Sequence, residues 1–210
     1  MQYKLAIFDF DGTLADSFPF FTSVFNRLAQ RHGFRSVAPE EVSQLRRLNA
    51  RQIMTHLGMP AWKLPIVATN FISLMSDAAS VPLFEGVSEL LGHLADEEVV
   101  LAIVSSNSYE NVERVLGPEN MRRVSYFECG VSIFGKRSRI RKVLKNSGIR
   151  PGEAIYIGDQ STDLEAARAE KVAFGAVSWG YGDVEALRSL APDELFTRAD
   201  DIRSIAGAPR

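Results

Sequence analysis

Four short apolar runs, each followed at once by small or charged polar residues, constrain the fold of this chain most. They occupy residues 5–8, 99–104, 154–157 and 172–177. Runs this short and this continuously apolar are typical of strands that are buried on both faces, so they predict the interior of a parallel sheet. Amphipathic helical patterns separate the later runs, and a further strand is expected near residues 125–132. This alternation indicates an α/β fold with helices on both faces of the sheet.

Residues 18–80 contain no such run and instead repeat the spacing of amphipathic helices. The first helix presents an apolar face that begins at Phe18, and Gly33 ends it. We therefore expect two domains. A Rossmann-like core of three layers comprises residues 1–17 and 81–210, and an all-helical domain, residues 18–80, is inserted after the first strand.

Composition excludes several classes of protein. The chain has 210 residues and a net charge of −2, which provides no basic field for nucleic acid. Its one cysteine, Cys129, cannot form an intramolecular disulfide and fits a reducing cytoplasm. No apolar run approaches the roughly 20 residues of a membrane span, and the N-terminus lacks the basic start of a signal peptide. We expect a cytoplasmic protein without nucleic-acid or membrane partners, and the oligomeric state stays open.

The residues that carry chemistry follow the predicted strands. Asp9 and Asp11 come after the first run, and because side chains two apart on a strand share a face, their carboxylates should emerge side by side. The second run leads into a Ser-Ser-Asn segment at 105–107, and the third into Asp159 and Asp163. Ligands of open α/β sheets bind beyond the carboxyl ends of the strands, so one crevice should contain all these groups.

Clustered carboxylates need a cation if they are to stay ionised together. The candidate ligands are all hard oxygens, which favours Mg²⁺. The metal, together with Lys136, could hold a dianionic phosphoryl group against the carboxylates. One aspartate could then attack phosphorus, while its neighbour, with a pKa raised by crowding, exchanges a proton with the leaving group and with water.

The segment DFDGTLADS resembles the first motif, D-x-D-G-T, of the haloacid dehalogenase superfamily of phosphatases. LAIVSSN is similar to the second motif, YIGDQSTDLEAA looks like the fourth, and SWGYG at 178–182 resembles the phosphoglycolate-phosphatase-like branch. The resemblance covers residues 1–17 and roughly 83–190, and residues 18–82 match only in kind, as a helical cap. It implies a Mg²⁺-dependent phosphomonoesterase that forms an aspartyl-phosphate from a small phosphorylated metabolite, with phosphoglycolate as one candidate.

The resemblance also implies roles for the acidic residues and the lysine. Asp9 would be the nucleophile and Asp11 the general acid and base. Mg²⁺ would be held by the Asp9 carboxylate, the Asp11 backbone carbonyl and Asp159. Lys136 would pair with Asp9 and the phosphoryl group, and Asp163 would support Lys136 or a water molecule on the metal.

Four further residues are implied in holding the phosphate. Ser105, with the amide of Ser106, would bind phosphate oxygens, although the same residues could simply cap the next helix. Gly12 would allow the backbone to approach closely, and Thr13 would form a hydrogen bond within the loop.

The lysine assignment has rivals, because this chain departs from the family pattern. The family lysine is often followed by proline, whereas Arg137 follows Lys136 here. Lys142 and Lys145 lie nearby, but the helical pattern places both inside a helix and facing solvent. Lys136 is expected near the N-terminus of that helix, where the backbone favours an anion. A second departure, Glu170-Lys171 in place of the usual Ala-Gly after the fourth motif, should affect only a turn.

Three arginines of the helical segment are candidates for substrate recognition. Arg46, Arg47 and Arg51 could form an ordinary solvated helix face, or they could recognise a carboxylate or second phosphate of the substrate.

Two alternatives to a phosphatase stay open from the sequence. One is a phosphomutase on the same scaffold, and the other is a non-catalytic, phosphate-binding regulatory protein. A haloacid dehalogenase is disfavoured, because cleavage of a carbon–halogen bond needs neither Mg²⁺ nor a second catalytic aspartate.

Overall fold

A parallel sheet of six strands forms the centre of the molecule. The computed structural model describes residues 3–45, 50–76, 81–130 and 135–207. The strands are β1 (Leu5–Phe8), β2 (Val100–Val104), β3 (Tyr126–Glu128), β4 (Ala154–Gly158), β5 (Ala173–Val177) and β6 (Glu194–Phe196). Their order is β3-β2-β1-β4-β5-β6, and every neighbouring pair is parallel. The prediction of a parallel α/β sheet is therefore confirmed.

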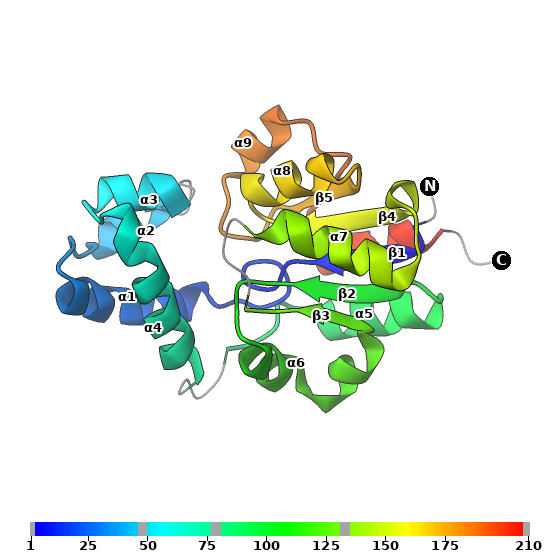
Figure 1. Cartoon of the computed structure of the whole chain (residues 1–210), viewed down its shortest axis with the longest axis horizontal. Helices are drawn as coiled ribbons and strands as arrows, with labels where there is room; N and C mark the ends of the chain where they lie inside the picture. Colours follow the sequence, from blue (N-terminus) through cyan, green and yellow to red (C-terminus); the bar gives the residue numbers. More distant parts are fainter. Residues whose placement is uncertain (1–2, 46–49, 77–80, 131–134, 208–210) are drawn as a thin grey trace.

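The first strand occupies the middle of this sheet, between β2 and β4 (Figure 1). All four of its residues are fully buried, which explains why it is apolar throughout. The chain runs from β1 towards one edge through β2 and β3, and then returns to the other side of β1 as β4. Such a switch in strand order opens a crevice beyond the strand ends, and Asp9 follows β1 at this point.

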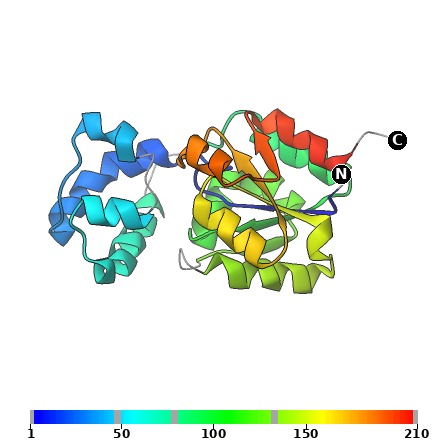
Figure 2. The same ribbon diagram turned by 90° about the horizontal axis from the view of Figure 1, so that it is seen from above.

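Helices cover both faces of the sheet (Figure 2). On one face, side chains such as Leu91 and Ile202 join Ile103 of the sheet in one apolar cluster. On the other face, Ile140 and Leu164 pack with residues of β1, β2, β4 and β5. The elements of the first face are α5 (Val87–Asp96), α6 (Tyr109–Arg123) and η4 (Ala199–Ala206). The elements of the second face are α7 (Lys136–Ser147), α8 (Ser161–Ala169) and α9 (Val184–Ser189). A short 3₁₀ turn, η3 (Pro151–Glu153), precedes β4.

A group of helices stands apart from the sheet at one end of the molecule (Figures 1 and 2). It has two small apolar cores, one around Leu28 and one around Leu57. As expected, the first helix ends at Gly33, which adopts the left-handed conformation with φ of 65°. The elements are α1 (Phe18–His32), η1 (Pro39–Glu41), α2 (Val42–Leu45), α3 (Ala50–His56), η2 (Ala61–Lys63) and α4 (Leu64–Ser76). None of the described residues of this group forms a strand.

The two segments that join this group to the sheet run side by side. The amide of Asp16 donates to the carbonyl of Pro82, and the amide of Phe84 donates to the carbonyl of Leu14, both at 2.9 Å. The chain therefore leaves the core and returns to it through one paired stalk.

Some elements differ from the sequence-based expectations. The helix α6 was anticipated only as the helix that the segment 105–107 could cap, without bounds, and it contains Gly117 with a φ of 71° followed by Pro118, which interrupts the helical pattern. The edge strand β6 has three residues, too few for a periodic signal. The strand expected near 125–132 extends only over Tyr126–Glu128, and residues 131–134 lie outside the described part. Within that described part, no helix is both long and apolar enough to cross a bilayer.

Candidate active site

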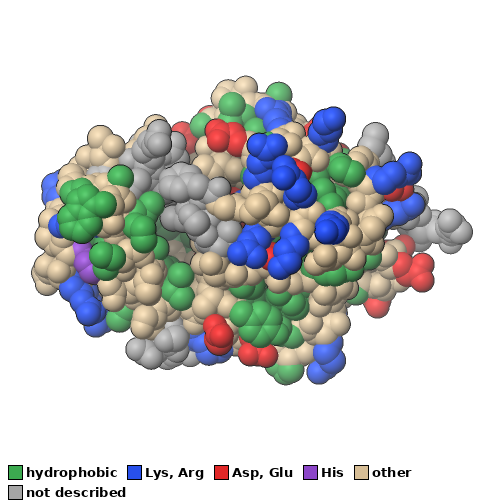
Figure 3. Space-filling model, viewed as in Figure 1, with side chains coloured by type: hydrophobic (Ala, Val, Ile, Leu, Met, Phe, Trp, Pro, Cys, Tyr) green, Lys and Arg blue, Asp and Glu red, His purple; other side chains and the backbone are tan. Residues whose placement is uncertain are grey.

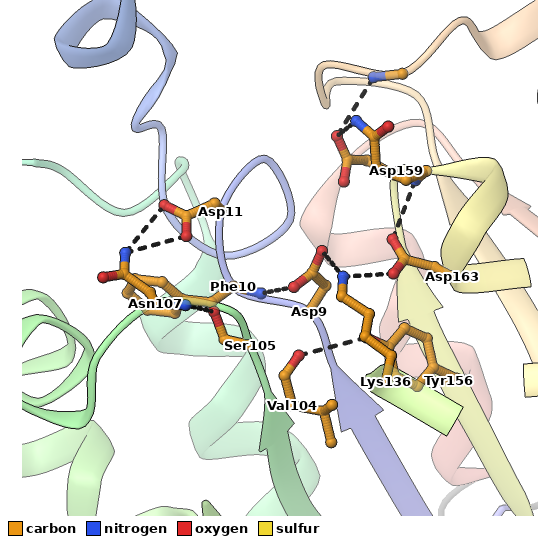
Figure 4. A network of polar contacts seen from close by, with 12 residues as sticks. Asp9, Phe10, Asp11, Val104, Ser105, Asn107, Lys136, Tyr156, Asp159 and Asp163 are labelled. Atoms are coloured by element: carbon orange, nitrogen blue, oxygen red, sulfur yellow. Dashed lines mark hydrogen bonds and ion pairs between the residues drawn. The ribbon is translucent and has the colours of Figure 1, made fainter. Parts of the chain in front are cut away.

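Asp9 and Lys136 form a buried ion pair at the end of β1 (Figure 4). One oxygen of Asp9, Oδ1, accepts a hydrogen bond from the amide of Phe10 at 2.8 Å. The other, Oδ2, accepts one from the Lys136 ammonium at 2.6 Å. The same ammonium donates to Oδ1 of Asp163 at 2.5 Å. Burial alone would lower the pKa of Lys136, but the charges of Asp163 and Asp9 raise it well above its ordinary value.

This geometry follows from three different elements. Asp9 leaves the central strand, Asp163 lies in the first turn of α8, and Lys136 is the first residue of α7. Both helices begin beyond the carboxyl ends of the strands, because each follows a strand and all strands of the sheet run in the same direction. The first residues of α7 and α8 therefore meet the end of β1.

Three carboxylates crowd together at this point. Oxygens of Asp9, Asp159 and Asp163 lie within 4.8 Å of one another. Burial is the main cause that raises the pKa of Asp159 to about 6, and the charge of Asp9 adds to it. Burial also raises the pKa of Asp163, although Lys136 opposes this shift. The cluster therefore favours a further positive charge.

Within the described residues, one carboxylate oxygen of this cluster has no hydrogen-bond partner, and it belongs to Asp159. Its Oδ2 accepts a hydrogen bond from the amide of Tyr181 at 2.7 Å, whereas its buried Oδ1 has no partner among the described residues. The two oxygens of Asp163 are both engaged, one by Lys136 and the other by the amide of Gln160 at 3.1 Å. A buried, unpaired carboxylate oxygen beside two other carboxylates is a donor set that fits a hard divalent cation.

Asp11 points away from Asp9 (Figure 4). Its Oδ1 accepts a hydrogen bond from the Ser17 hydroxyl at 2.6 Å, and its Oδ2 accepts one from the Asn107 side-chain amide at 3.0 Å. Burial is the main cause that raises the pKa of Asp11 to about 6. The hydrogen bond from Ser17 opposes this shift, and the charge of Asp9 is a smaller, raising contribution.

The expectation that the two carboxylates emerge side by side is therefore wrong. The pKa of Asp11 is raised as expected, but burial contributes more to this shift than the charge of Asp9. The strand ends at Phe8 and the chain turns at Gly12, whose φ is 81°. The alternation of a strand does not extend through a turn, so Asp9 and Asp11 face different partners.

The structure distributes the predicted phosphate-binding residues around this turn. Ser105 is buried at the end of β2, with its hydroxyl accepting a hydrogen bond from the Asn107 amide at 3.0 Å, and Ser106 beside it is half-buried. The hydroxyl of Thr13 is buried and has no hydrogen-bond partner in the described part of the chain. Gly12 lies directly against Asp159, since a Cβ at this position would approach the Asp159 Oδ2 to 2.6 Å.

The rival lysines lie elsewhere. Lys142 pairs with Glu128 at 2.8 Å with its side chain half-exposed, and Lys145 is exposed. The candidate cap residues Arg46 and Arg47 lie outside the described residues, as does the side chain of Arg51.

Three residues bond the aspartates or their partners at this site, and the sequence did not indicate these contacts. Ser17 and Asn107 are the last residues of the recognised segments DFDGTLADS and LAIVSSN, and their polar character was the available signal. Tyr181 belongs to the SWGYG segment, but no local pattern indicates that its hydroxyl lies 2.7 Å from the Ser17 hydroxyl.

Comparison with known proteins identifies the family of this chain. A sequence profile described as haloacid dehalogenase-like hydrolase matches residues 6–177. The chain belongs to the haloacid dehalogenase-like hydrolase family. The resemblance noted from the sequence motifs is therefore confirmed.

Several relatives of this haloacid dehalogenase-like hydrolase carry the names of phosphatases. A phosphoglycolate phosphatase of Synechococcus elongatus is 32% identical over 198 residues, which is 93% of each chain. An N-acetylmuramic acid 6-phosphate phosphatase of Pseudomonas aeruginosa is 23% identical and covers 86% of this chain and 84% of its own. A crystal structure from Lactobacillus plantarum, provisionally assigned as a phosphoglycolate phosphatase, superposes with a TM-score of 0.80 at 25% identity over 98% of this chain and 100% of its own.

Proposed function

We propose that this hydrolase is a Mg²⁺-dependent phosphomonoesterase that hydrolyses a small phosphorylated metabolite through a phosphoryl group carried on Asp9. The observation that carries the proposal is the buried ammonium of Lys136 between Asp9 and Asp163, beside the unpaired oxygen of Asp159. Such a site combines a carboxylate nucleophile with positive charge on one side and a cation position on another. The phosphatase names of the relatives support the same reaction class.

In the first half-reaction, a carboxylate oxygen of Asp9 attacks phosphorus. A bond forms between this oxygen and phosphorus, and the bond to the leaving oxygen breaks with its electron pair moving to that oxygen. Asp11 donates the proton that the leaving oxygen takes up. Attacking and leaving oxygens lie roughly in line, so the acid must stand away from the nucleophile. The separate orientation of Asp11 fits this requirement (Figure 4).

In the second half-reaction, water attacks the phosphorus carried on Asp9. Asp11, now deprotonated, takes a proton from this water, and the phosphorus–Asp9 bond breaks with its electrons returning to the carboxylate. Inorganic phosphate leaves, and both aspartates regain their starting protonation. Lys136 stabilises the phosphoryl oxygens through charge-assisted hydrogen bonds in both halves.

A bound Mg²⁺ would supply charge stabilisation for the phosphoryl oxygens. The carboxylates of Asp9 and Asp159 would hold it, together with the backbone carbonyl of Asp11. Asp163 would keep Lys136 in place by accepting a hydrogen bond from its ammonium. The unpaired oxygen of Asp159 supports this assignment.

The remaining phosphoryl oxygens would be bound beside the turn at Gly12. Ser105, the amide of Ser106 and Thr13 are the proposed donors, and the buried, unpartnered hydroxyl of Thr13 supports the assignment. Gly12 permits the close approach between this turn and Asp159.

The domain organisation proposed for this enzyme places a cap, residues 18–80, above a core of residues 1–17 and 81–210. The separate apolar cores of the helical group and its paired stalk support this division. Arg46, Arg47 and Arg51 are then candidates for binding a second anion of the substrate. Phosphoglycolate carries such an anion, and the relative at 32% identity supports it as the first substrate to test.

The test is the Asp9→Asn variant, assayed for release of inorganic phosphate from p-nitrophenyl phosphate and phosphoglycolate with Mg²⁺ present. Turnover should fall below detection while the protein stays folded. Asp96→Asn, at the end of α5, is the matched surface control and should turn over like wild type. A folded Asp9→Asn protein that is as active as wild type would contradict the mechanism. Phosphate release without a bisphosphate activator separates the phosphatase from a phosphomutase.

A further inference from the structure

Tyr181 lies in the loop after β5, and its hydroxyl reaches back to the segment that follows Asp11. The hydroxyls of Tyr181 and Ser17 are 2.7 Å apart, and the Ser17 hydroxyl donates to Asp11 Oδ1 at 2.6 Å. A serine hydroxyl has one proton, and Ser17 uses it on Asp11. Tyr181 is therefore the donor in the 2.7 Å contact between the two hydroxyls, which is much shorter than the 3.4 Å from the same Tyr181 hydroxyl to the carbonyl of Ala15.

The position of this tyrosine is fixed on several sides. Its amide donates to Asp159 Oδ2 at 2.7 Å, and its ring packs against Phe18, the first residue of α1, with centroids 5.1 Å apart. The preceding residue, Gly180, presses so closely on Asp159 that an added Cβ would lie 2.2 Å from the Asp159 Cβ. The Tyr181 hydroxyl is therefore held at one place relative to the cluster of Asp9, Asp159 and Asp163.

The carboxylate of Asp11 is held by side chains from two different segments in this arrangement. Asn107, which follows β2, binds Oδ2 at 3.0 Å, and the Tyr181–Ser17 pair reaches Oδ1 from the loop after β5. One hydrogen bond alone would leave the carboxyl free to pivot, whereas two from different elements define its orientation.

We propose that Tyr181 is a positioning residue for Asp11, because its hydroxyl orients Ser17 and Ser17 holds the carboxyl where the leaving oxygen departs. This inference rests on the proposed function, in which Asp11 protonates that oxygen. A misplaced general acid slows the departure of a poor leaving group, which needs a proton. It affects a strongly activated leaving group little, because such a group departs as an anion.

The experiment compares Tyr181→Phe with wild type on an alkyl phosphate and on 2,4-dinitrophenyl phosphate. The measured quantity is kcat/KM, which covers the steps up to departure of the leaving group. We expect about a tenfold loss for the alkyl ester and less than about a twofold loss for the activated ester. Ser17→Ala should show the same pattern, and the double variant should lose no more than Ser17→Ala alone.

Tyr126→Phe is the matched control, since it removes one tyrosine hydroxyl that donates to a backbone carbonyl away from the site. It should leave both values unchanged, and melting temperatures check that each variant is folded. If each variant, Tyr181→Phe and Ser17→Ala, loses as much kcat/KM on the activated ester as on the alkyl ester, or loses none on either, the positioning role is overturned. The proposed function is not affected by that result. A wild-type protein that hydrolyses neither ester would overturn the proposed function as well.

Discussion

At the scale of single residues, Lys136 distinguishes this site most clearly from an ordinary acidic cluster. Its side chain is 9% exposed and lies between the carboxylates of Asp9 and Asp163. Lys142 and Lys145 belong to the same helix and point to solvent or to Glu128. The same helix thus carries a buried ammonium between two carboxylates at its first residue and exposed lysines roughly two turns further on.

We expect Lys136→Ala to lower kcat for p-nitrophenyl phosphate by about 10²-fold, because one electrostatic stabiliser of the phosphoryl group is lost. The variant should also melt at a lower temperature, since Asp9 and Asp163 lose a buried partner. Steady-state kinetics and thermal unfolding measure these two effects. Lys142→Ala and Lys145→Ala are the controls from the same helix and should stay within about twofold of wild type in kcat. An equal loss in either control would transfer the role to another lysine.

At the scale of elements, the junction between α4 and α6 ties the helical group to the site. The side-chain amide of Asn111 in α6 donates to the carbonyl of Ile72 at 3.0 Å and to Oδ1 of Asn107 at 2.9 Å. The last four carbonyls of a helix lack partners within it, and Arg114 donates to one of these, on Met75. Because Asn107 also binds Asp11, this junction reaches the candidate general acid through one side chain.

Asn111→Ala should lower the melting temperature by about 3–6 °C, since buried hydrogen-bond partners are left unsatisfied at a cost of about 1–2 kcal/mol. Scanning calorimetry gives the shift. Asn146→Ala, on the exposed surface of α7, is the matched control and should melt within about 1 °C of wild type. The junction contributes nothing to stability if the two variants melt alike.

At the scale of the whole molecule, the carboxylate cluster joins elements from distant parts of the sequence. Asp9 follows β1, Asp159 follows β4 and Asp163 lies in α8. A cation that binds only the folded arrangement must stabilise all of these elements together. Metal binding should therefore be visible in global unfolding as well as in activity.

Saturating Mg²⁺ should raise the melting temperature by about 5 °C or more, an increment expected when the ion is present at about 100 times its dissociation constant. A chelator should reverse the shift and abolish phosphate release. Asp159→Asn should remove most of the shift, whereas Asp96→Asn should retain it. If Asp159→Asn keeps the full Mg²⁺-dependent shift, the ion binds elsewhere.

The proposed cap predicts a difference between substrates. Replacing Arg46, Arg47 or Arg51 by alanine should lower kcat/KM for phosphoglycolate by about tenfold where that arginine binds the carboxylate. The value for p-nitrophenyl phosphate, which has no second anion, should change little. Arg27→Ala, on the exposed side of α1, is the control from the same helical group. Equal losses on both substrates, or none on either, would exclude these arginines from substrate recognition.

Much of the fold and of the carboxylate cluster could be predicted from the sequence, because both follow from local patterns. A strand buried on both faces must be apolar throughout, which is why 5–8 and 154–157 were recognisable as strands. Parallel strands end at one edge of their sheet, so residues that follow them, such as Asp9 and Asp159, must meet there. Glycine with a positive φ ends helices, as at Gly33.

Only the tertiary structure decided how the polar side chains around Asp11 are oriented. The strand ends at Phe8 and Asp11 already lies in the turn that the carbonyl of Phe10 closes, and a turn carries no periodic pattern that could be extrapolated. Tyr181 meets Ser17 across 164 positions of the chain, and Asn107 meets Asp11 across 96. Burial leaves a repeating signature along the sequence, whereas a single hydrogen bond between distant loops leaves none. Such a hydrogen bond forms only once packing has brought the two loops together.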